Sequence, residues 1–224
     1  MSALAFHDVG VRYTGSDLPA LQACTFEVAA GERVALLGNN GSGKTTILLA
    51  TVALVPHTGS IIVCGERLHV NDPAHARRST GLLSSSPEDQ LLFPRVLDDV
   101  AFSLTSRGVP DDVAKARALA TLERLDAGSL ADLSPYRLSR GQRLRAALAG
   151  TLVTEPQLLL LDEPTSGLDP AGRRLLLAHL NTLTSAMLIA THDLDFARRC
   201  CHSYVLMDDG QVAESGTNFD DVVL

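Results

Sequence analysis

The chain has 224 residues, of which 46% are hydrophobic, and its formal net charge at pH 7 is −7. It is long enough for one large domain, and its acidic balance without a lysine or arginine block argues against a nucleic-acid surface. No apolar run reaches the roughly 18–20 residues that cross a bilayer. The N-terminus does not resemble a leader, so we expect a cytoplasmic protein. The four cysteines lack metal-site spacing and are expected to be reduced thiols.

The first part of the chain predicts strands followed by a glycine-rich loop. Residues 1–35 read as short β segments with a break at 15–19, and 34–37 is an apolar run typical of a strand buried on both faces. The loop Gly38-Asn39-Asn40-Gly41-Ser42-Gly43-Lys44-Thr45 follows at once, and residues 45–55 have helical composition. Strand, glycine loop and helix in this order are the context of a phosphate-binding loop.

The chemistry of this loop follows from its residue types. Glycines at 38, 41 and 43 allow tight turns that aim backbone N–H groups at phosphate oxygens at a helix N-terminus. Lys44 supplies a cation for the outer phosphates, and Thr45 supplies a hydroxyl for Mg²⁺. The sequence therefore predicts nucleotide binding.

The remainder predicts a helical insert in an α/β core. Further short strands are expected at 59–63, at 67–70 and from Gly81, and 96–152 is mainly helical. Strand and helix then alternate, in the segments 158–161, 170–183, 186–190, 194–201 and 203–207. We expect a nucleotide-binding core at 1–84 and 152–224, with a helical subdomain at 85–151.

An acidic pair follows the apolar strand 158–161. Asp162 is expected to hold Mg²⁺ close to a phosphate loop on a neighbouring strand. Glu163 is placed to orient and deprotonate an attacking water. The alternative, an exposed acidic turn before Pro164, is weakened by the position of the pair relative to the phosphate loop.

Three further positions have two readings each. His192 follows the strand 186–190, where it would face a γ-phosphate, but a single histidine in such a place is more often structural. Tyr13 in an early strand is usually a packing residue. Ser139 and Gly141 open an amphipathic helix, which is both an ordinary N-cap and a second anion site.

Taken together, these segments resemble the ATP-binding-cassette (ABC) ATPases over essentially the whole chain. The matching motifs are Walker A at Gly38–Thr46, the LSGGQ signature at Leu138–Gln142, Walker B at Leu158–Glu163, the D-loop at Ser166–Asp169, the switch histidine at His192 and the A-loop aromatic at Tyr13. The resemblance implies a P-loop NTPase (RecA-like) core with an N-terminal antiparallel β subdomain and an inserted α-helical subdomain, together forming one ABC ATPase domain over residues 1–224.

The resemblance also implies a division of roles. ATP and Mg²⁺ are the expected cofactors, with Glu163, His192 and Lys44 as catalytic residues and Thr45 and Asp162 at the metal. The expected ATP contacts are Tyr13, Gly38, Asn39, Asn40, Gly41, Ser42, Gly43, Lys44, Thr45 and Thr46 of one chain and Ser139, Gly141 and Gln142 of another. ATP would therefore hold two copies, or this chain and a paralogue, head to tail.

Two segments narrow the resemblance within the family. Ser86–Leu91 and Leu97–Phe102 are similar to the NPDDQLF and EEDVAFG segments of energy-coupling-factor importer ATPases, which serve cobalt, nickel and biotin systems. This implies a transmembrane T component and a substrate-binding membrane subunit as partners, with the ATPase peripheral on the cytoplasmic face of the membrane. The T component's helices would dock in a groove beside this segment.

Two positions depart from the family pattern. Ser85 stands where the Q-loop glutamine is expected, and Gln90 matches a later glutamine. Serine is too short to reach the metal and water without a bridging water, so we hypothesise loosened metal contact and membrane coupling at Ser85. Arg140 stands where glycine is commoner in the signature. It would either add positive charge near the partner's γ-phosphate or point to solvent.

Other functions remain as alternatives. A haem- or lipid-exporting ABC ATPase is the main competitor of the importer. A non-transport ABC ATPase would usually carry coiled-coil insertions, zinc elements or two cassettes, and the chain shows none of these. A small-molecule kinase on the same scaffold is disfavoured by the signature and the D-loop.

Overall fold

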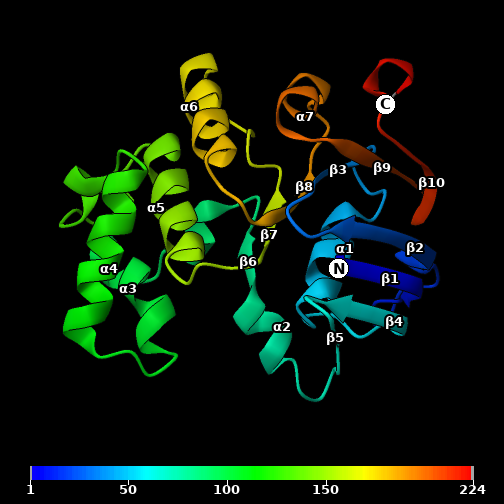
Figure 1. Ribbon diagram of the computed structural model, residues 1–224, viewed down its shortest axis with the longest axis horizontal. Coiled ribbons are helices and arrows are strands. Elements are labelled where there is room, and N and C mark those ends of the chain that lie inside the picture. The colour runs from blue at the N-terminus through cyan, green and yellow to red at the C-terminus, as the bar shows by residue number, and fades with distance from the viewer. Residues whose placement is uncertain (1, 223–224) are drawn as a thin grey trace.

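The computed structural model describes residues 2–222 of the chain, which fold into two sheets and a set of helices (Figure 1). The strands are β1 (Ser2–Val11), β2 (Leu21–Ala29), β3 (Arg33–Leu37), β4 (Thr58–Val63), β5 (Glu66–Arg67), β6 (Thr80–Leu83), β7 (Leu158–Asp162), β8 (Ala186–Ala190), β9 (Ser203–Asp208) and β10 (Gln211–Gly216). The α-helices are α1 (Lys44–Thr51), α2 (Ala74–Ser79), α3 (Val96–Thr105), α4 (Asp111–Arg124), α5 (Arg140–Leu152), α6 (Pro170–Asn181) and α7 (Leu194–Cys200). Short 3₁₀ helices lie at Pro87–Gln90, Gly128–Leu130, Pro135–Arg137 and Phe219–Asp221.

The larger sheet has the order β10-β9-β3-β8-β7-β6 and is parallel except for β10. Its central strands are buried on both faces, as their continuous apolar sequences predict. In β7, Leu158 and Leu160 pack into one core and Leu159 and Leu161 into the other. The smaller sheet, β2-β1-β4-β5, is antiparallel and shares the first of these cores with α1. The expected combination of a P-loop core and an antiparallel β subdomain is confirmed.

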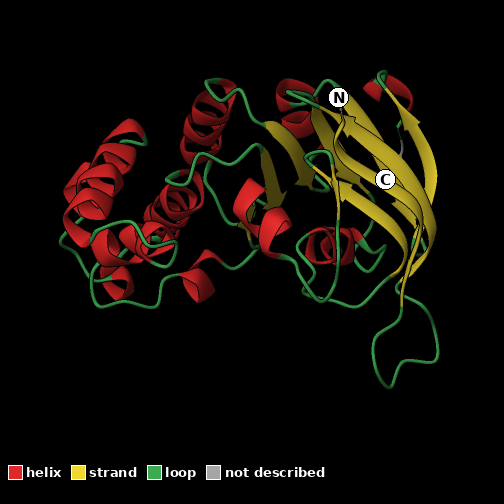
Figure 2. Cartoon of the chain, turned by 60° about the horizontal axis from the view of Figure 1, so that its bottom comes forward, coloured by secondary structure: helices red, strands yellow, loops and turns green. Residues whose placement is uncertain are grey.

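Helices α3, α4 and α5 form a group of their own beside the sheets, shown in green and yellow-green in Figure 1 and as the helical end of the molecule in Figure 2. Apolar residues at helical spacing, such as Val100, Leu104, Leu122 and Leu148, are fully or almost fully buried in the second core. This is the inserted helical part that the sequence predicts.

Two expectations about strands are wrong. β7 does not neighbour β3, because β8 lies between them, so Asp162 lies two strands away from the strand that carries the phosphate loop. Apolar parallel strands all look alike in sequence, and their order is set by how the connecting helices cross the sheet. The strand expected at 67–70 is only β5, two residues long; the Leu68 N–H still donates to the Ile61 carbonyl oxygen at 2.7 Å, and the chain then turns at 69–72.

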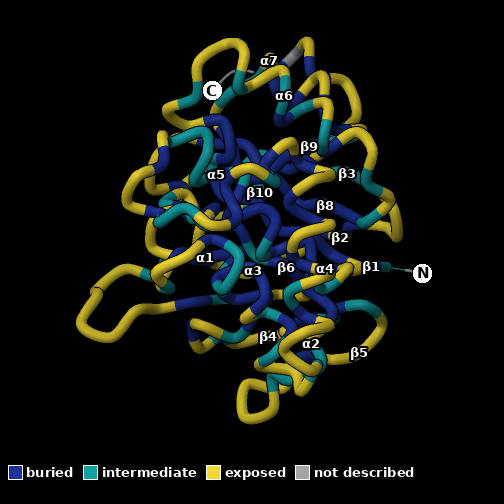
Figure 3. Tube along the Cα trace, turned by 90° about the vertical axis from the view of Figure 1, so that its left-hand side faces the viewer, coloured by how far each residue is buried: buried dark blue, intermediate teal, exposed yellow. Residues whose placement is uncertain are grey.

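Burial is concentrated in the middle of the molecule, where β3 and β8 run, and loops form most of the exposed trace (Figure 3). Within residues 2–222, no helix combines the length and the apolar character needed to cross a bilayer. The structure therefore places the functional groups at strand ends and helix starts around a rigid central sheet.

Candidate nucleotide-binding site

The phosphate loop connects β3 to α1 and depends on its glycines. Gly38 has φ +141°, and a Cβ there would lie 2.3 Å from the Met207 carbonyl oxygen. Gly43, at the N-cap of α1, has φ +102°, and a Cβ there would lie 2.9 Å from the Ala20 carbonyl oxygen. Both positions combine left-handed backbone with close packing, so neither accepts a side chain without rearrangement.

Lys44 is the first residue of α1 and turns back over the loop. Its Nζ donates hydrogen bonds to the carbonyl oxygens of Gly38 at 2.6 Å and Asn39 at 3.0 Å. Burial lowers the pKa of Lys44, and the nearby carboxylates of Glu163 and Asp162 act in the opposite direction. The ammonium group is thus a nearly enclosed cation at the loop, suited to an anionic ligand.

The remaining loop residues present backbone and hydroxyl groups. Asn39, Asn40 and Gly41 are exposed, whereas the Ser42 hydroxyl is buried and has no hydrogen-bond partner among the described residues. A buried hydroxyl without a partner is costly unless a ligand satisfies it. The Thr46 hydroxyl lies 3.2 Å from the Tyr13 hydroxyl, and this places the Tyr13 ring, 40% exposed, beside the loop.

Asp162 ends β7 and reaches the phosphate loop across the intervening strand. Its Oδ2 accepts a hydrogen bond from the Thr45 hydroxyl at 2.9 Å. Burial raises the pKa of Asp162, while hydrogen bonds from Thr45 and then Ser85 lower it. A buried carboxylate beside a hydroxyl is a donor set of hard oxygens, so Thr45 and Asp162 fit Mg²⁺.

Glu163 directly follows the end of β7 at Asp162. Its backbone has φ +46° and its N–H donates to the Ala190 carbonyl oxygen at 2.8 Å. The carboxylate lies between Lys44, 4.0 Å away, and His192 Nδ1, 2.9 Å away, although no hydrogen-bond geometry is met with either. The His192 ring is 64% exposed, whereas the Glu163 carboxylate oxygens are buried beneath it.

The signature residues form a helix start that is complete in itself. Ser139 caps α5: its Oγ accepts from the Gln142 N–H at 3.3 Å, and Gln142 Oε1 accepts from the Ser139 N–H at 2.8 Å. This reciprocal capping box confirms the expected N-cap. Among the described residues, no hydrogen bond or ion pair joins Ser139, Gly141 or Gln142 to the phosphate loop of the same chain.

The Arg140 side chain does not simply point to solvent. The side chain turns into its own chain, where Nε donates to the Ser166 carbonyl oxygen at 2.8 Å and Nη2 to the Ser85 carbonyl oxygen at 3.4 Å. Nη1 also lies 3.8 Å from Glu88 Oε1. A long flexible side chain on a helix start gives no sequence signal for such tertiary contacts.

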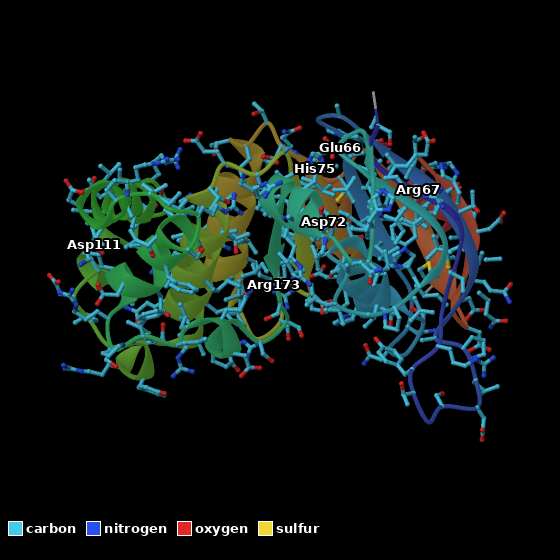
Figure 4. All side chains as sticks on the ribbon, turned by 90° about the horizontal axis from the view of Figure 1, so that it is seen from below. Glu66, Arg67, Asp72, His75, Asp111 and Arg173 are labelled. Atoms are coloured by element: carbon cyan, nitrogen blue, oxygen red, sulfur yellow. The ribbon has the colours of Figure 1, made fainter. Side chains whose placement is uncertain are left out.

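Sequence reasoning also missed the pair of Arg173 and Asp193. Arg173 Nη1 donates to Asp193 Oδ2 at 2.7 Å, and its Nε donates to the Leu168 carbonyl oxygen at 3.4 Å. Arg173 lies near the middle of the molecule in Figure 4, far from Asp111 at the helical end. Asp193 caps α7 and follows His192, so this ion pair joins the D-loop to the segment that carries His192. The available signal was an aspartate directly before a short amphipathic helix.

These features define the class of protein to which the chain belongs. A glycine loop between β3 and α1, an enclosed lysine, and a threonine that pairs with a strand-end aspartate are the phosphate-binding parts of a P-loop NTPase.

Comparison with known proteins gives the family. The ABC transporter family matches residues 21–166. A Gloeobacter violaceus protein named among ABC transporter ATP-binding proteins is 43% identical over 200 residues, 88% of this chain and 82% of its own. The energy-coupling factor transporter ATP-binding protein EcfA of Methanosphaera stadtmanae is 37% identical over 204 residues, 88% of this chain and 73% of its own.

Solved structures agree with this assignment. The cbiO1 protein from Clostridium perfringens, described as part of the ABC transporter complex cbiONQ, superposes with a TM-score of 0.85 and 31% identity. The match covers 96% of this chain and 88% of the other. The chain belongs to the ABC transporter family, and it is an ATP-binding ATPase cassette of that family.

Proposed function

We propose that this chain is the ATPase subunit of an energy-coupling-factor type importer, taking up a metal ion such as cobalt or nickel, or a vitamin such as biotin. One observation carries the proposal. The two segments that are similar to importer ATPases meet at a single groove of about 300 Å³ between the larger sheet and the helical group, which is lined by Gln90 and Leu91 of the first segment and by Asp99, Val100 and Phe102 of the second. Similarity to EcfA and to cbiO1 supports the same subfamily.

Each residue at the nucleotide end of the site has a proposed role in binding or hydrolysis. Lys44 and the loop N–H groups bind the phosphates of ATP, and the Tyr13 ring stacks on the adenine. Glu163 accepts the proton of the attacking water, since its carboxylate is held next to the loop with free acceptor capacity. His192, 2.9 Å from Glu163, contacts the γ-phosphate and so reports its presence.

Thr45 and Asp162 are the residues that would hold Mg²⁺. Their oxygens already converge at 2.9 Å, and the buried Asp162 carboxylate gains from a nearby cation. When bound, the ion neutralises phosphate charge during hydrolysis. Thr45 and Asp162 would orient its site through the hydrogen bond between them.

The exposed helix start at the signature indicates that the nucleotide of a second chain binds there. Ser139 and Gly141 expose a capped helix start, an anion-binding geometry, that contacts no phosphate loop of its own chain. We assign it to ATP on a second ATPase chain, bound head to tail. ATP then joins the two chains, and hydrolysis followed by product release separates them.

The groove is the proposed docking site for a transmembrane T component. Leu92 is 79% exposed and Phe102 is 51% exposed at the groove, and the Phe102 ring lies 5.2 Å from the Phe93 ring. Exposed large apolar side chains grouped in one place mark a contact surface. An apolar helix end of the membrane partner fits this surface, which places the ATPase on the cytoplasmic face of the membrane. The substrate-binding membrane subunit recognises the solute.

Affinity purification of the chain from detergent-solubilised membranes of its source tests this proposal. We expect an integral membrane protein of the T-component type to co-purify, and mass spectrometry of the complex to show a metal ion or vitamin. Leu92→Asp and Phe102→Asp should each abolish co-purification. Val113→Asp is the matched control, because Val113 is 44% exposed on α4 and does not line the groove.

The outcome separates the importer from its main competitor. Recovery of a membrane subunit that carries haem or lipid would replace the importer with an exporter. Equal loss of the partner in Val113→Asp and Phe102→Asp would remove the groove from the proposal.

A further inference from the structure

Arg140 joins three segments that are far apart in sequence. It is the first residue of α5, yet its guanidinium group donates to the D-loop at Ser166 and to the end of the β6 loop at Ser85. Arg140 lines the same narrow crevice as Ser85, Glu163 and Ser166. One side chain therefore links the signature to the two loops that border the hydrolytic carboxylate.

The D-loop is shaped to accept this guanidinium group. Gly167 has φ +69°, and a Cβ there would lie 2.4 Å from Arg140 Nε and 2.6 Å from its Cδ. A side chain at this position would therefore displace the arginine from the contact and would also require a left-handed backbone. The Ser166 and Leu168 N–H groups are themselves bonded to the Glu163 and Thr165 carbonyl oxygens, at 3.0 Å and 3.2 Å. Arg140 thus rests on a tight turn that starts at Glu163.

The second contact leads to the metal end of the site. Arg140 bonds the backbone of Ser85, and Ser85 lines the same crevice as Glu163, the residue that follows Asp162. Ser84, next in the chain, donates its N–H to Gln90 Oε1 at 3.1 Å, which fixes the loop from the other side. Serine cannot span the distance that a glutamine spans, so the link between helical group and strand end must come from another group.

We propose that Arg140 is a positioning residue that supplies this link from within the signature. It holds the D-loop and the Ser85 loop against the start of α5, so that the helical group and the end of β7 move together. A planar guanidinium with several donors can satisfy two carbonyl oxygens and face Glu88 at once, which a lysine cannot do.

Hydrogen–deuterium exchange of the purified chain without nucleotide tests the contact directly, and it requires neither a dimer nor a membrane partner. In Arg140→Gly, the amides of Ser166, Leu168 and Ser84 should exchange faster by about ten-fold, the scale of a lost charge-assisted hydrogen bond. Arg143→Ala is the matched control: it removes an arginine from the same helix start, but one whose Nε donates to the Pro135 carbonyl oxygen.

Steady-state hydrolysis tests the function of the link. Arg140→Gly should lower kcat by about ten-fold while the KM for ATP stays constant, because the nucleotide contacts of the chain's own loop are untouched. Ser85→Gln in the Arg140→Gly background should restore most of kcat by supplying the longer side chain. The kcat of Arg140→Lys should lie between those of Arg140→Gly and the unaltered chain. If Arg140→Gly lowers the Tm of the whole chain, Arg140→Lys is used in its place.

Each contrary result overturns the inference. Unchanged hydrogen–deuterium exchange in Arg140→Gly, or equal acceleration in Arg143→Ala, would show that Arg140 does not hold the D-loop and the Ser85 loop. A raised KM for ATP with unchanged exchange places Arg140 on the nucleotide of a second copy instead. If Ser85→Gln restores none of the kcat lost in Arg140→Gly, a longer side chain at position 85 does not substitute for Arg140.

Discussion

The two halves of the nucleotide site differ in how much of their chemistry one chain completes. At the ends of β3, β7 and β8, polar and charged groups already face one another, as the buried Lys44 does with Glu163 and as Thr45 does with the buried Asp162. At the start of α5, Ser139 is exposed, and within residues 2–222 the side chains of Ser139 and Gln142 form hydrogen bonds only with each other's backbone N–H. The first half is a site held by a rigid sheet, and the second is a surface.

This difference has a physical basis. Groups fixed at adjacent strand ends keep their geometry at little entropic cost, because the sheet is buried on both faces. Helices α3 to α5 share a buried apolar core with the sheet, and polar contacts add to this packing at the start of α5. The D-loop shows this: Arg140 holds it from the helical group, and Arg173 holds it from the side of α7. We therefore expect the core half to govern hydrolysis and the helical half to govern assembly with a second chain.

The largest expected effect belongs to the core half. Glu163→Gln should reduce ATP hydrolysis by about 10²–10⁴-fold, the contribution of a positioned general base, because an amide cannot accept the proton of water. ATP binding should persist, since Lys44 and the loop N–H groups are unchanged. Phosphate release and nucleotide binding on the same preparation measure both. Hydrolysis within a few-fold of the unaltered chain would assign the base to another group.

The next effect belongs to the helical half and leaves chemistry intact. Asp99 Oδ1 accepts hydrogen bonds from the Leu92 N–H at 2.6 Å and the Phe93 N–H at 2.9 Å, while the residue is 8% exposed. Asp99→Ala should lower the free energy of unfolding by about 1–3 kcal/mol, because buried donors lose their acceptor. Urea unfolding measures the loss. Asp99→Asn keeps the acceptor and should lose much less.

The same residue predicts a pH dependence. Burial raises the pKa of Asp99, with hydrogen bonds from Phe93 and Leu92 acting in the opposite direction. The folded chain therefore binds this proton more tightly than the unfolded chain. Its contribution to stability is complete below the unfolded pKa and is lost as pH rises through the folded pKa. Asp99→Asn should remove this component of the pH profile, and an unchanged profile would assign it to another carboxyl group.

A smaller effect sharpens the distinction between own and partner nucleotide. Ser139→Ala removes the N-cap of α5, which should cost about 1 kcal/mol of stability. Hydrolysis should fall at chain concentrations where dimers form, whereas ATP binding to single chains should stay constant. Fluorescent-nucleotide titration at low chain concentration checks the second statement. Ser139→Thr retains the hydroxyl and is the control. Weaker binding by single chains would place Ser139 in the chain's own site.

Local features of both halves could be predicted from the sequence. The apolar run before Gly38 and the acidic end of β7 each carry a motif whose geometry is set within about ten residues, so strand, loop and helix followed directly. The capping box at Ser139 and Gln142 is equally local, because its partners lie three residues apart.

Relations between distant segments could not be predicted. The position of β8 between β3 and β7 depends on crossover paths, and the strands themselves are uniformly apolar. The contact of Arg140 with Ser166 requires the D-loop to pass the start of α5, which no residue type at either position signals. The role of Asp99 was hidden because acidic residues in a first helical turn are usually exposed and favoured by the helix dipole.

The smallest expected effect lies at the outer edge of the core half, where the site is least enclosed. The Tyr13 hydroxyl lies 3.2 Å from the Thr46 hydroxyl, and its ring remains partly exposed. If the ring stacks on adenine, Tyr13→Ala should weaken ATP binding by about 0.5–1.5 kcal/mol, roughly two- to ten-fold in Kd. Tyr13→Phe keeps the ring and loses only the hydroxyl contact, so its Kd should change little. Parallel titrations with ATP and with inorganic triphosphate separate base from phosphate: the alanine effect should disappear for triphosphate. A loss that is equal for both ligands would show that Tyr13 acts by packing against the loop through Thr46.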